Sequence, residues 1–132
     1  MRDFDTDTIR AIAAFEEITK TEVRDCIRGE MLYFLVNSGK AGKAIGKGGA
    51  AIKTAERLLQ RPIKIFEWSD DTVQFIKNMI PTAKKISINN SEAVVSVDSK
   101  SKGMVIGKEG SNIEVMRAFL ERNSDVKSLR IV

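Results

Sequence analysis

Two short glycine-rich segments carry the residues whose types and spacing could do chemistry in this chain. The first runs from Ile45 to Ile52 and the second from Ile106 to Ile113, and both have the pattern Ile-Gly-Lys-x-Gly-x-x-Ile. Glycine at both ends lets the backbone turn sharply and lets a sugar-phosphate strand approach the main chain. A helix that begins directly after the turn would offer unpaired N–H groups and a partial positive charge to phosphate oxygens.

The side chains around each turn predict how a polyanion would be held. Lys47 and Lys108 add a mobile positive charge at the tips, and isoleucines before and after each turn form an apolar floor on which bases could rest. The second turn carries an acid, Glu109, beside its lysine, so we expect the second unit to grip less tightly. The candidate binding residues are Lys40, Lys43, Ile45, Gly46, Lys47, Gly48, Gly49, Ile52, Lys53 and Arg57 in the first half, and Lys100, Lys102, Ile106, Gly107, Lys108, Glu109, Gly110 and Ile113 in the second.

Charge is distributed unevenly along the chain. The net charge is only +4, but residues 38–64 contain seven basic residues and one acid, whereas residues 1–37 contain five basic residues and eight acids. This asymmetry favours one face for a polyanion and another for a different partner. The alternative that charge alone leaves open is a solvated helix face.

The chain repeats itself with a shift of 61 positions. Residues 33–60 align with residues 94–121 without a gap, and nine of these 28 pairs are identical, including the glycines of both turns. A fixed period with no gap indicates a duplication. We therefore expect two domains, residues 1–68 and 69–132, with no flexible linker between them and hence a fixed angle.

Periodicity and turn residues predict the same order of elements in each half: helix, strand, strand, helix, helix, strand. In the first half we expect a helix over 6–19, a hairpin of strands near 22–28 and 31–36, a short helix, a helix with Ile52, Ala55, Leu58 and Leu59 on one face, and a strand over 63–67. In the second half we expect a helix with Ser69 as its N-cap and with Val73, Ile76 and Ile80 as the apolar stripe. Strands near 84–90 and 93–98, two helices and a strand over 126–132 follow.

Composition excludes several classes of function. The chain has no histidine, so it lacks the usual general base and the commonest transition-metal ligand. We expect no enzyme activity and no cofactor or metal. The single cysteine, Cys26, fits a buried thiol in a reducing compartment, and no apolar stretch approaches the ~20 residues that span a bilayer. From the single cysteine and the lack of a long apolar stretch we expect a cytoplasmic protein with no membrane partner.

The repeated turn and the element order around it resemble the KH domain family, whose Gly-x-x-Gly loop clamps a short run of nucleotide backbone. The order of elements resembles the type II arrangement, which implies an α+β fold with a three-stranded sheet packed on helices in each domain. Two such domains in tandem, over nearly the whole chain, resemble the KH module of the NusA transcription factors, most of all the short archaeal form. This resemblance implies single-stranded RNA as the ligand, RNA polymerase or other transcription proteins as partners, and a role in pausing, termination or antitermination.

Two other functions stay open at this point. A ribosome-associated or RNA-processing KH protein would have the same loops. A protein-interaction scaffold would use the acidic N-terminal helix and would show no salt-dependent RNA binding, whereas counterion release predicts a steep loss of RNA affinity with salt.

Overall fold

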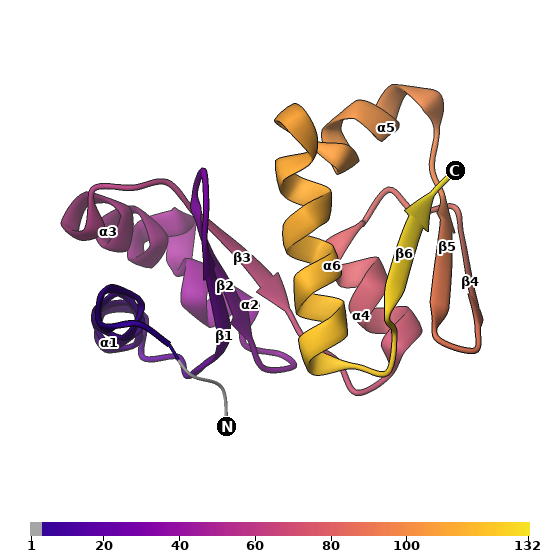
Figure 1. The fold of residues 1–132 in the computed structure, drawn as a ribbon. Coiled ribbons are helices and arrows are strands. Elements are labelled where there is room, and N and C mark those ends of the chain that lie inside the picture. The colour runs from indigo at the N-terminus through magenta and orange to yellow at the C-terminus, as the bar shows by residue number, and fades with distance from the viewer. Residues whose placement is uncertain (1–3) are drawn as a thin grey trace. The chain divides into compact units, whose positions relative to one another are not determined.

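The structure is a computed structural model that describes residues 4–132. The chain divides between Glu67 and Trp68 into two compact units. Each unit is α+β, with a three-stranded sheet and helices (Figure 1). The order of elements in both is helix, strand, strand, helix, helix, strand, as the sequence predicts, with a one-turn 3₁₀ segment between the last two helices.

The elements of the first unit are α1 (Thr6–Thr19), β1 (Val23–Arg28), β2 (Leu32–Val36), α2 (Ala41–Ile45), the 3₁₀ turn η1 (Lys47–Gly49), α3 (Ala50–Leu59) and β3 (Ile63–Glu67). The predicted hairpin is confirmed, because β1 pairs with β2 in antiparallel register. β3 then pairs with the other edge of β2 in parallel register, from Leu32 opposite Ile63 to Val36 opposite Glu67. The parallel pairing places the α2–η1–α3 segment in the crossover between two neighbouring strands.

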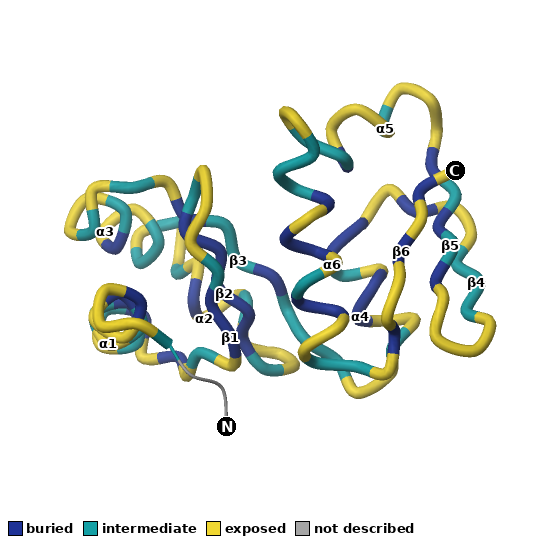
Figure 2. The backbone as a smooth tube through the Cα atoms, in the orientation of Figure 1, coloured by how far each residue is buried: buried dark blue, intermediate teal, exposed yellow. Residues whose placement is uncertain are grey.

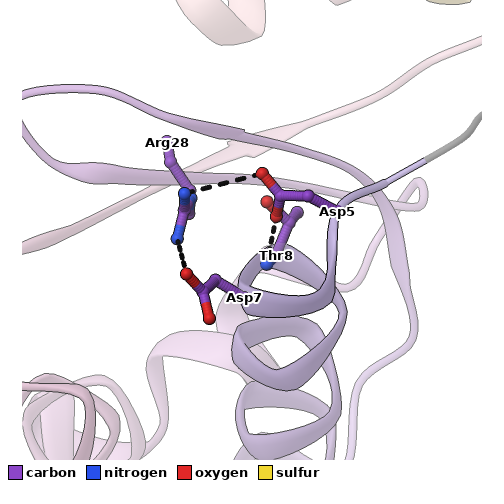
Figure 3. Close-up of polar contacts among 4 residues, drawn as sticks. All are labelled: Asp5, Asp7, Thr8 and Arg28. Atoms are coloured by element: carbon purple, nitrogen blue, oxygen red, sulfur yellow. Dashed lines mark hydrogen bonds and ion pairs between the residues drawn. The ribbon is translucent and has the colours of Figure 1, made fainter.

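The first helix begins where the sequence predicts. Asp5 is its N-cap and accepts a hydrogen bond of 2.8 Å from the backbone N–H of Thr8 (Figure 3). A carboxylate at this position satisfies one of the free N–H groups of the first turn and interacts favourably with the helix dipole. The helix ends at Thr19, and its C-cap residue Lys20 takes the left-handed conformation with φ 56°.

The core of the first unit lies between its helices and one face of its sheet. Phe15 of α1 stacks on Phe34 of β2 with ring centroids 4.0 Å apart, and both rings are fully buried. Ala44 of α2 and Ala55 of α3 belong to the same buried cluster. Figure 2 shows along the backbone which parts of the chain are buried. The predicted buried thiol is confirmed, because Cys26 is 2% exposed. α2 and α3, which flank the first glycine turn, are thus anchored on a packed core.

One side chain of α3 differs from the prediction. Ala55 is fully buried and Ile52 and Leu59 pack against the core, but Leu58 is 63% exposed. The prediction of Leu58 on the buried face is therefore wrong. Positions 55, 58 and 59 share one side of a helix in a helical projection, and helical spacing alone does not show how wide the covered stripe is.

The elements of the second unit are α4 (Thr72–Met79), β4 (Lys85–Asn89), β5 (Glu92–Ser96), α5 (Ser99–Ile106), the 3₁₀ turn η2 (Lys108–Gly110), α6 (Ser111–Asn123) and β6 (Ser128–Ile131). Its sheet repeats the first, with β4 antiparallel and β6 parallel to the central strand β5. The crossover α5–η2–α6 again joins two parallel neighbouring strands. The duplication seen in the sequence is thus a duplication of topology.

The start of α4 corrects two predictions. The N-cap is Asp71, whose carboxylate accepts from the N–H groups of Val73 and Gln74, while the hydroxyl of Ser69 accepts from the N–H of Asp71. Val73 is 47% exposed and does not belong to the buried stripe, although Ile76 and Ile80 do. The buried face also includes Phe75 and Met79, which share it at helical spacing.

Candidate nucleic-acid interface

The first glycine turn is a sharp reversal between α2 and α3. Gly46 closes α2 with φ 81° and ψ 167°, and its N–H donates to the carbonyl of Gly42 at 2.9 Å. Gly48 and Gly49 follow with φ of 62° and 78°, and the N–H of Gly49 donates to the carbonyl of Gly46 at 3.0 Å. Three residues in four therefore have positive φ, a conformation that glycine adopts without the steric cost of a Cβ.

The second turn repeats this backbone to within about ten degrees. Gly107 has φ 82° and ψ 170°, Glu109 has φ 55° and Gly110 has φ 77°. The same two hydrogen bonds recur, from Gly107 to Gly103 at 2.9 Å and from Gly110 to Gly107 at 3.1 Å. The duplicated sequence thus specifies one turn geometry twice.

The first glycine of each turn has no room for a side chain. A Cβ on Gly46 would lie 2.7 Å from the backbone nitrogen of Ala51, and a Cβ on Gly107 would lie 2.7 Å from the Cβ of Asn112. At Gly48, in contrast, a Cβ would meet nothing within 4 Å. The turn is therefore closely packed at its base and open at its tip, where Lys47, Gly48, Lys108 and Glu109 are all exposed.

Both turns lead straight into a helix whose N-terminal N–H groups face the turn. The cap residues of α3 and α6 are Gly49 and Gly110, which have no side chain to accept those N–H groups. The first N–H of each helix, on Ala50 or Ser111, donates to the carbonyl of Lys47 or Lys108, so the N–H groups that follow it and the helix dipole are what favour an anion. The first turn of α3 contains no acidic residue, whereas α6 has Glu114 in its first turn.

The basic side chains predicted around the first turn lie on the elements next to it. Lys40 is the N-cap residue of α2, Lys43 lies on α2, and Lys53 and Arg57 lie one helical turn apart on α3. All four are exposed, as is Lys47. The Cε atom of Lys53 would lie 3.6 Å from a Cβ built on Gly49, so this side chain extends back toward the turn. The structure thus gathers five cationic side chains on the elements that form the first turn.

The equivalent positions of the second unit carry a different charge. Under the shift of 61 residues, Lys40, Lys43, Lys53 and Arg57 correspond to Ser101, Met104, Glu114 and Ala118. Only Lys108 keeps the positive charge of its counterpart, and Glu109 replaces Gly48. Lys100 and Lys102 on α5 are exposed and restore part of the charge. The two turns therefore share a backbone but differ strongly in electrostatics.

The predicted apolar floor is only partly available. Ile45 is 40% exposed and Ile106 is half-buried, so both reach the surface beside their turns. Ile52 is half-buried and packs against the core. Ile113 is 6% exposed, so its side chain lies in the core and we leave it out of the contact surface.

Three residues near the turns were missed in the sequence. Met104 on α5 is 81% exposed, directly before the second turn. Asn112 donates from Nδ2 to the carbonyl of Val105 at 2.9 Å and so ties the start of α6 to α5. Glu67 accepts from the N–H of Ala41 at 3.1 Å and ties β3 to the start of α2. Only Met104 could have been found from the sequence, because an apolar residue stands there at the position of Lys43 in the first repeat.

The arrangement offers binding groups for an anionic strand. Within residues 4–132, no three side chains among histidine, cysteine, aspartate and glutamate come together so as to hold a metal ion. None of the helices in the described part of the chain has the length and apolar character of a membrane span.

Known proteins share both the sequence and the fold. No protein-family model matches the chain. The chain is 30% identical over 134 residues to the probable transcription termination protein NusA of Methanocaldococcus jannaschii, which covers 96% of this chain and 73% of that protein. It is also 30% identical over 134 residues to the probable transcription termination protein NusA of Thermoplasma acidophilum, over 96% of this chain and 93% of that protein. The crystal structure of APE1850 matches with a TM-score of 0.75 and 32% identity, over 98% of this chain and 100% of that chain.

Fold and site together define a duplicated α+β protein that carries the same glycine turn in each unit. The identity to the archaeal proteins, over most of both chains, is more specific. The chain belongs to the archaeal NusA family.

Proposed function

We propose that this protein binds single-stranded RNA through its two glycine turns and acts in transcription termination or antitermination. In this proposal each unit is a type II KH domain, residues 1–68 and 69–132. The order of elements in both units supports the assignment. Relatives named as probable transcription termination proteins support the cellular role.

One observation carries the RNA proposal: the two units have nearly the same turn geometry, closely packed at the first glycine and exposed at the tip. Gly46 and Gly107 let the backbone before each turn pack directly on the start of α3 or α6, because a Cβ there would lie 2.7 Å from Ala51 or Asn112. A nucleotide strand would approach the open tip of each turn, where residues 47, 48, 108 and 109 are exposed. The strand would then receive hydrogen bonds from the N–H groups at the starts of α3 and α6. The protein supplies a binding surface in this account, with no catalytic step.

The different charges around the two turns imply different contributions of the two units to RNA affinity. Lys40, Lys43, Lys47, Lys53 and Arg57 would neutralise phosphates at the first turn, so most of the salt-dependent affinity comes from the first unit. The second unit would contribute its backbone N–H groups, Lys100, Lys102 and Lys108, at a turn weakened by Glu109. Bases would rest on Ile45 and Ile106. Transcription proteins such as RNA polymerase are the proposed protein partners.

Photo-crosslinking to a pool of single-stranded RNA, with the crosslinked peptides mapped by mass spectrometry, tests the proposal. We expect crosslinks in residues 40–57 and 100–113, with competition by single-stranded and not by double-stranded RNA. Crosslinks confined to other segments, or crosslinks whose yield does not fall as salt is raised, would favour a protein scaffold.

Sequencing RNA crosslinked to the protein in cells tests the cellular role. Nascent transcripts are expected, and ribosomal RNA alone would place the protein in ribosome assembly or RNA processing.

A further inference from the structure

A cavity of about 350 Å³ lies in the first unit at the end of α3 opposite the glycine turn. Its apolar wall is formed by residues of α1, β2 and α3, namely Ala11, Ala14, Leu32, Leu58 and Leu59. Ala11 and Leu32 are buried in the core, but Leu58 is 63% exposed. The core thus has an opening with a large apolar side chain exposed beside it.

Three arginines from different elements line the same cavity: Arg10 of α1, Arg28 at the end of β1 and Arg61 after α3. Arg61 donates to the carbonyl of Gly29, which holds its guanidinium beside the β1–β2 hairpin. Arg10 is exposed and makes no hydrogen bond or ion pair among the described residues. Such a rim of guanidinium groups favours carboxylates, which arginine binds with paired N–H donors.

Arg28 shows how a carboxylate is held at this rim. Its guanidinium lies 3.6 Å from the carboxylate of Asp5 and 3.6 Å from that of Asp7 (Figure 3). Both carboxylates are well exposed, at 64% and 70%, and exposed pairs of this kind contribute little to stability. An incoming carboxylate can therefore share or replace these contacts at small cost.

RNA fits this cavity less well than an acidic protein segment. Asp7 lines the opening and pairs with Arg28, so it acts against any anionic ligand, and the apolar wall is what distinguishes the two classes of ligand, because a phosphodiester strand has no bulky apolar side chain to fill it. The residues that line the cavity include no aromatic ring on which a base could stack. Apolar wall and arginine rim together match an apolar side chain flanked by carboxylates.

The cavity lies at the opposite end of α3 from the glycine turn, although Arg57 of the proposed RNA surface directly precedes Leu58. At a rise of 1.5 Å per residue, the ten residues of this helix put about 15 Å between the turn and the cavity. A strand held at the turn therefore leaves the cavity open to a second ligand.

We propose that the cavity between α1, α3 and the β1–β2 hairpin is a docking site for an acidic segment of a partner protein. The segment inserts a bulky apolar side chain against Leu58 and Leu59, and its aspartates or glutamates pair with Arg10, Arg28 and Arg61. This assignment is independent of the RNA proposal.

Selection of random dodecapeptides displayed on phage against the whole protein, followed by affinity measurement with the enriched synthetic peptides, tests this proposal. We expect the enriched peptides to combine several acidic residues with at least one bulky apolar residue. Arg10→Glu and Leu58→Ser, both at exposed positions, should each weaken peptide binding at least tenfold and leave RNA affinity unchanged. Lys53→Glu, on α3 like Leu58 but nearer the glycine turn and outside the cavity, is the matched control and should weaken RNA binding alone.

Several results would overturn the proposal. The first is that no peptides are enriched on the parent protein beyond those enriched on the Leu58→Ser variant. The second is that the enriched peptides have no excess of acidic residues. The third is that they bind Arg10→Glu as tightly as they bind the parent. A fall in RNA affinity for Arg10→Glu and Leu58→Ser, with peptide binding unchanged, would assign the cavity to RNA instead. Circular dichroism of each variant checks that the fold is retained.

Discussion

The two glycine turns allow an exchange of charges on an unchanged backbone. Lys43, Gly48 and Lys53 of the first unit correspond to Met104, Glu109 and Glu114 of the second. The variant Lys43→Met, Gly48→Glu and Lys53→Glu gives the first turn the side chains of the second. The reverse exchange, Met104→Lys, Glu109→Gly and Glu114→Lys, is the matched control. Glu109 already takes φ 55° where Gly48 takes φ 62°, so the backbone accepts both residues.

The expected effect follows from the number of cations. Five basic side chains surround the first turn. If each contacts a phosphate, these five side chains should contribute about −3.5, or ~0.7 per contact, to the slope of the logarithm of RNA affinity against the logarithm of salt concentration. Between about 50 and 200 mM salt this contribution is a loss of roughly 130-fold. Without Lys43 and Lys53 the contribution of the first turn should drop to about −2.1, a loss of roughly 18-fold.

The reverse exchange should act in the opposite direction. Two added lysines should steepen the slope by up to ~1.4, and removing Glu109 takes away a repulsive charge at the tip. Glu109→Gly also relieves a left-handed backbone, which should raise the free energy of unfolding by up to about 1 kcal/mol. Glu114→Lys removes the exposed ion pair with Arg117 at small cost.

Fluorescence anisotropy of a labelled single-stranded RNA, titrated at four or more salt concentrations, measures these slopes. Urea unfolding of each variant provides the stability control. Equal slopes for the parent and both exchange variants would refute the assignment of these lysines to phosphate contacts. A changed sequence preference at constant slope would mean that they contact bases instead.

Other substitutions test single elements of the account. Gly46→Ala and Gly107→Ala should each lower the free energy of unfolding in urea by about 2 kcal/mol, because both glycines have positive φ and a Cβ there would lie 2.7 Å from Ala51 or Asn112. Gly103→Ala should raise the free energy of unfolding by about 0.5 kcal/mol, because this glycine lies within α5 and its Cβ would enter open space. Equal effects at the three positions would contradict the geometry. Hydrogen bonds from the Thr8 hydroxyl and N–H, and then the charge of Arg28, lower the pKa of Asp5. Its stabilisation is therefore present above its ordinary pKa and lost as pH falls through the lowered pKa, so the Tm deficit of Asp5→Ala should shrink in acid; a pH-independent deficit would argue against the cap. Affinity should rise sharply once an RNA reaches about 8–12 nucleotides, since each KH loop holds roughly four; a smooth length dependence, unchanged by a Gly/Ser insertion before Ser69, would mean that the units bind independently.

Local signals predicted most of the fold. The α1 helix follows from apolar spacing behind Asp5, and the β1–β2 hairpin follows from two apolar runs around Gly29. The parallel pairing of β2 with β3 joins segments some thirty residues apart, and periodicity has no information on such a partner. The cap of α4 was misplaced because Ser69 and Asp71 can both cap a helix, and the path of the backbone decides between them.

The site was predictable where it depends on spacing and not where it depends on burial. The repeat located both turns, because a shared backbone needs glycine at the same offsets. It did not distinguish Ile106, which reaches the surface, from Ile113, which lies in the core. The cavity beside Leu58 also escaped prediction, since Arg10, Arg28 and Arg61 are brought together only by the packing of α1, α3 and the hairpin.

The affinity of a variant with aspartate at the tips of both turns tests the central claim most directly. Replacing Lys47, Gly48, Lys108 and Glu109 by aspartate changes exposed residues only, and aspartate tolerates the left-handed conformation of positions 48 and 109. Circular dichroism and urea unfolding should therefore show a folded protein. We predict that its affinity for single-stranded RNA falls at least tenfold at moderate salt, because four carboxylates would face the phosphates. A folded variant that binds RNA as tightly as the parent would contradict the account.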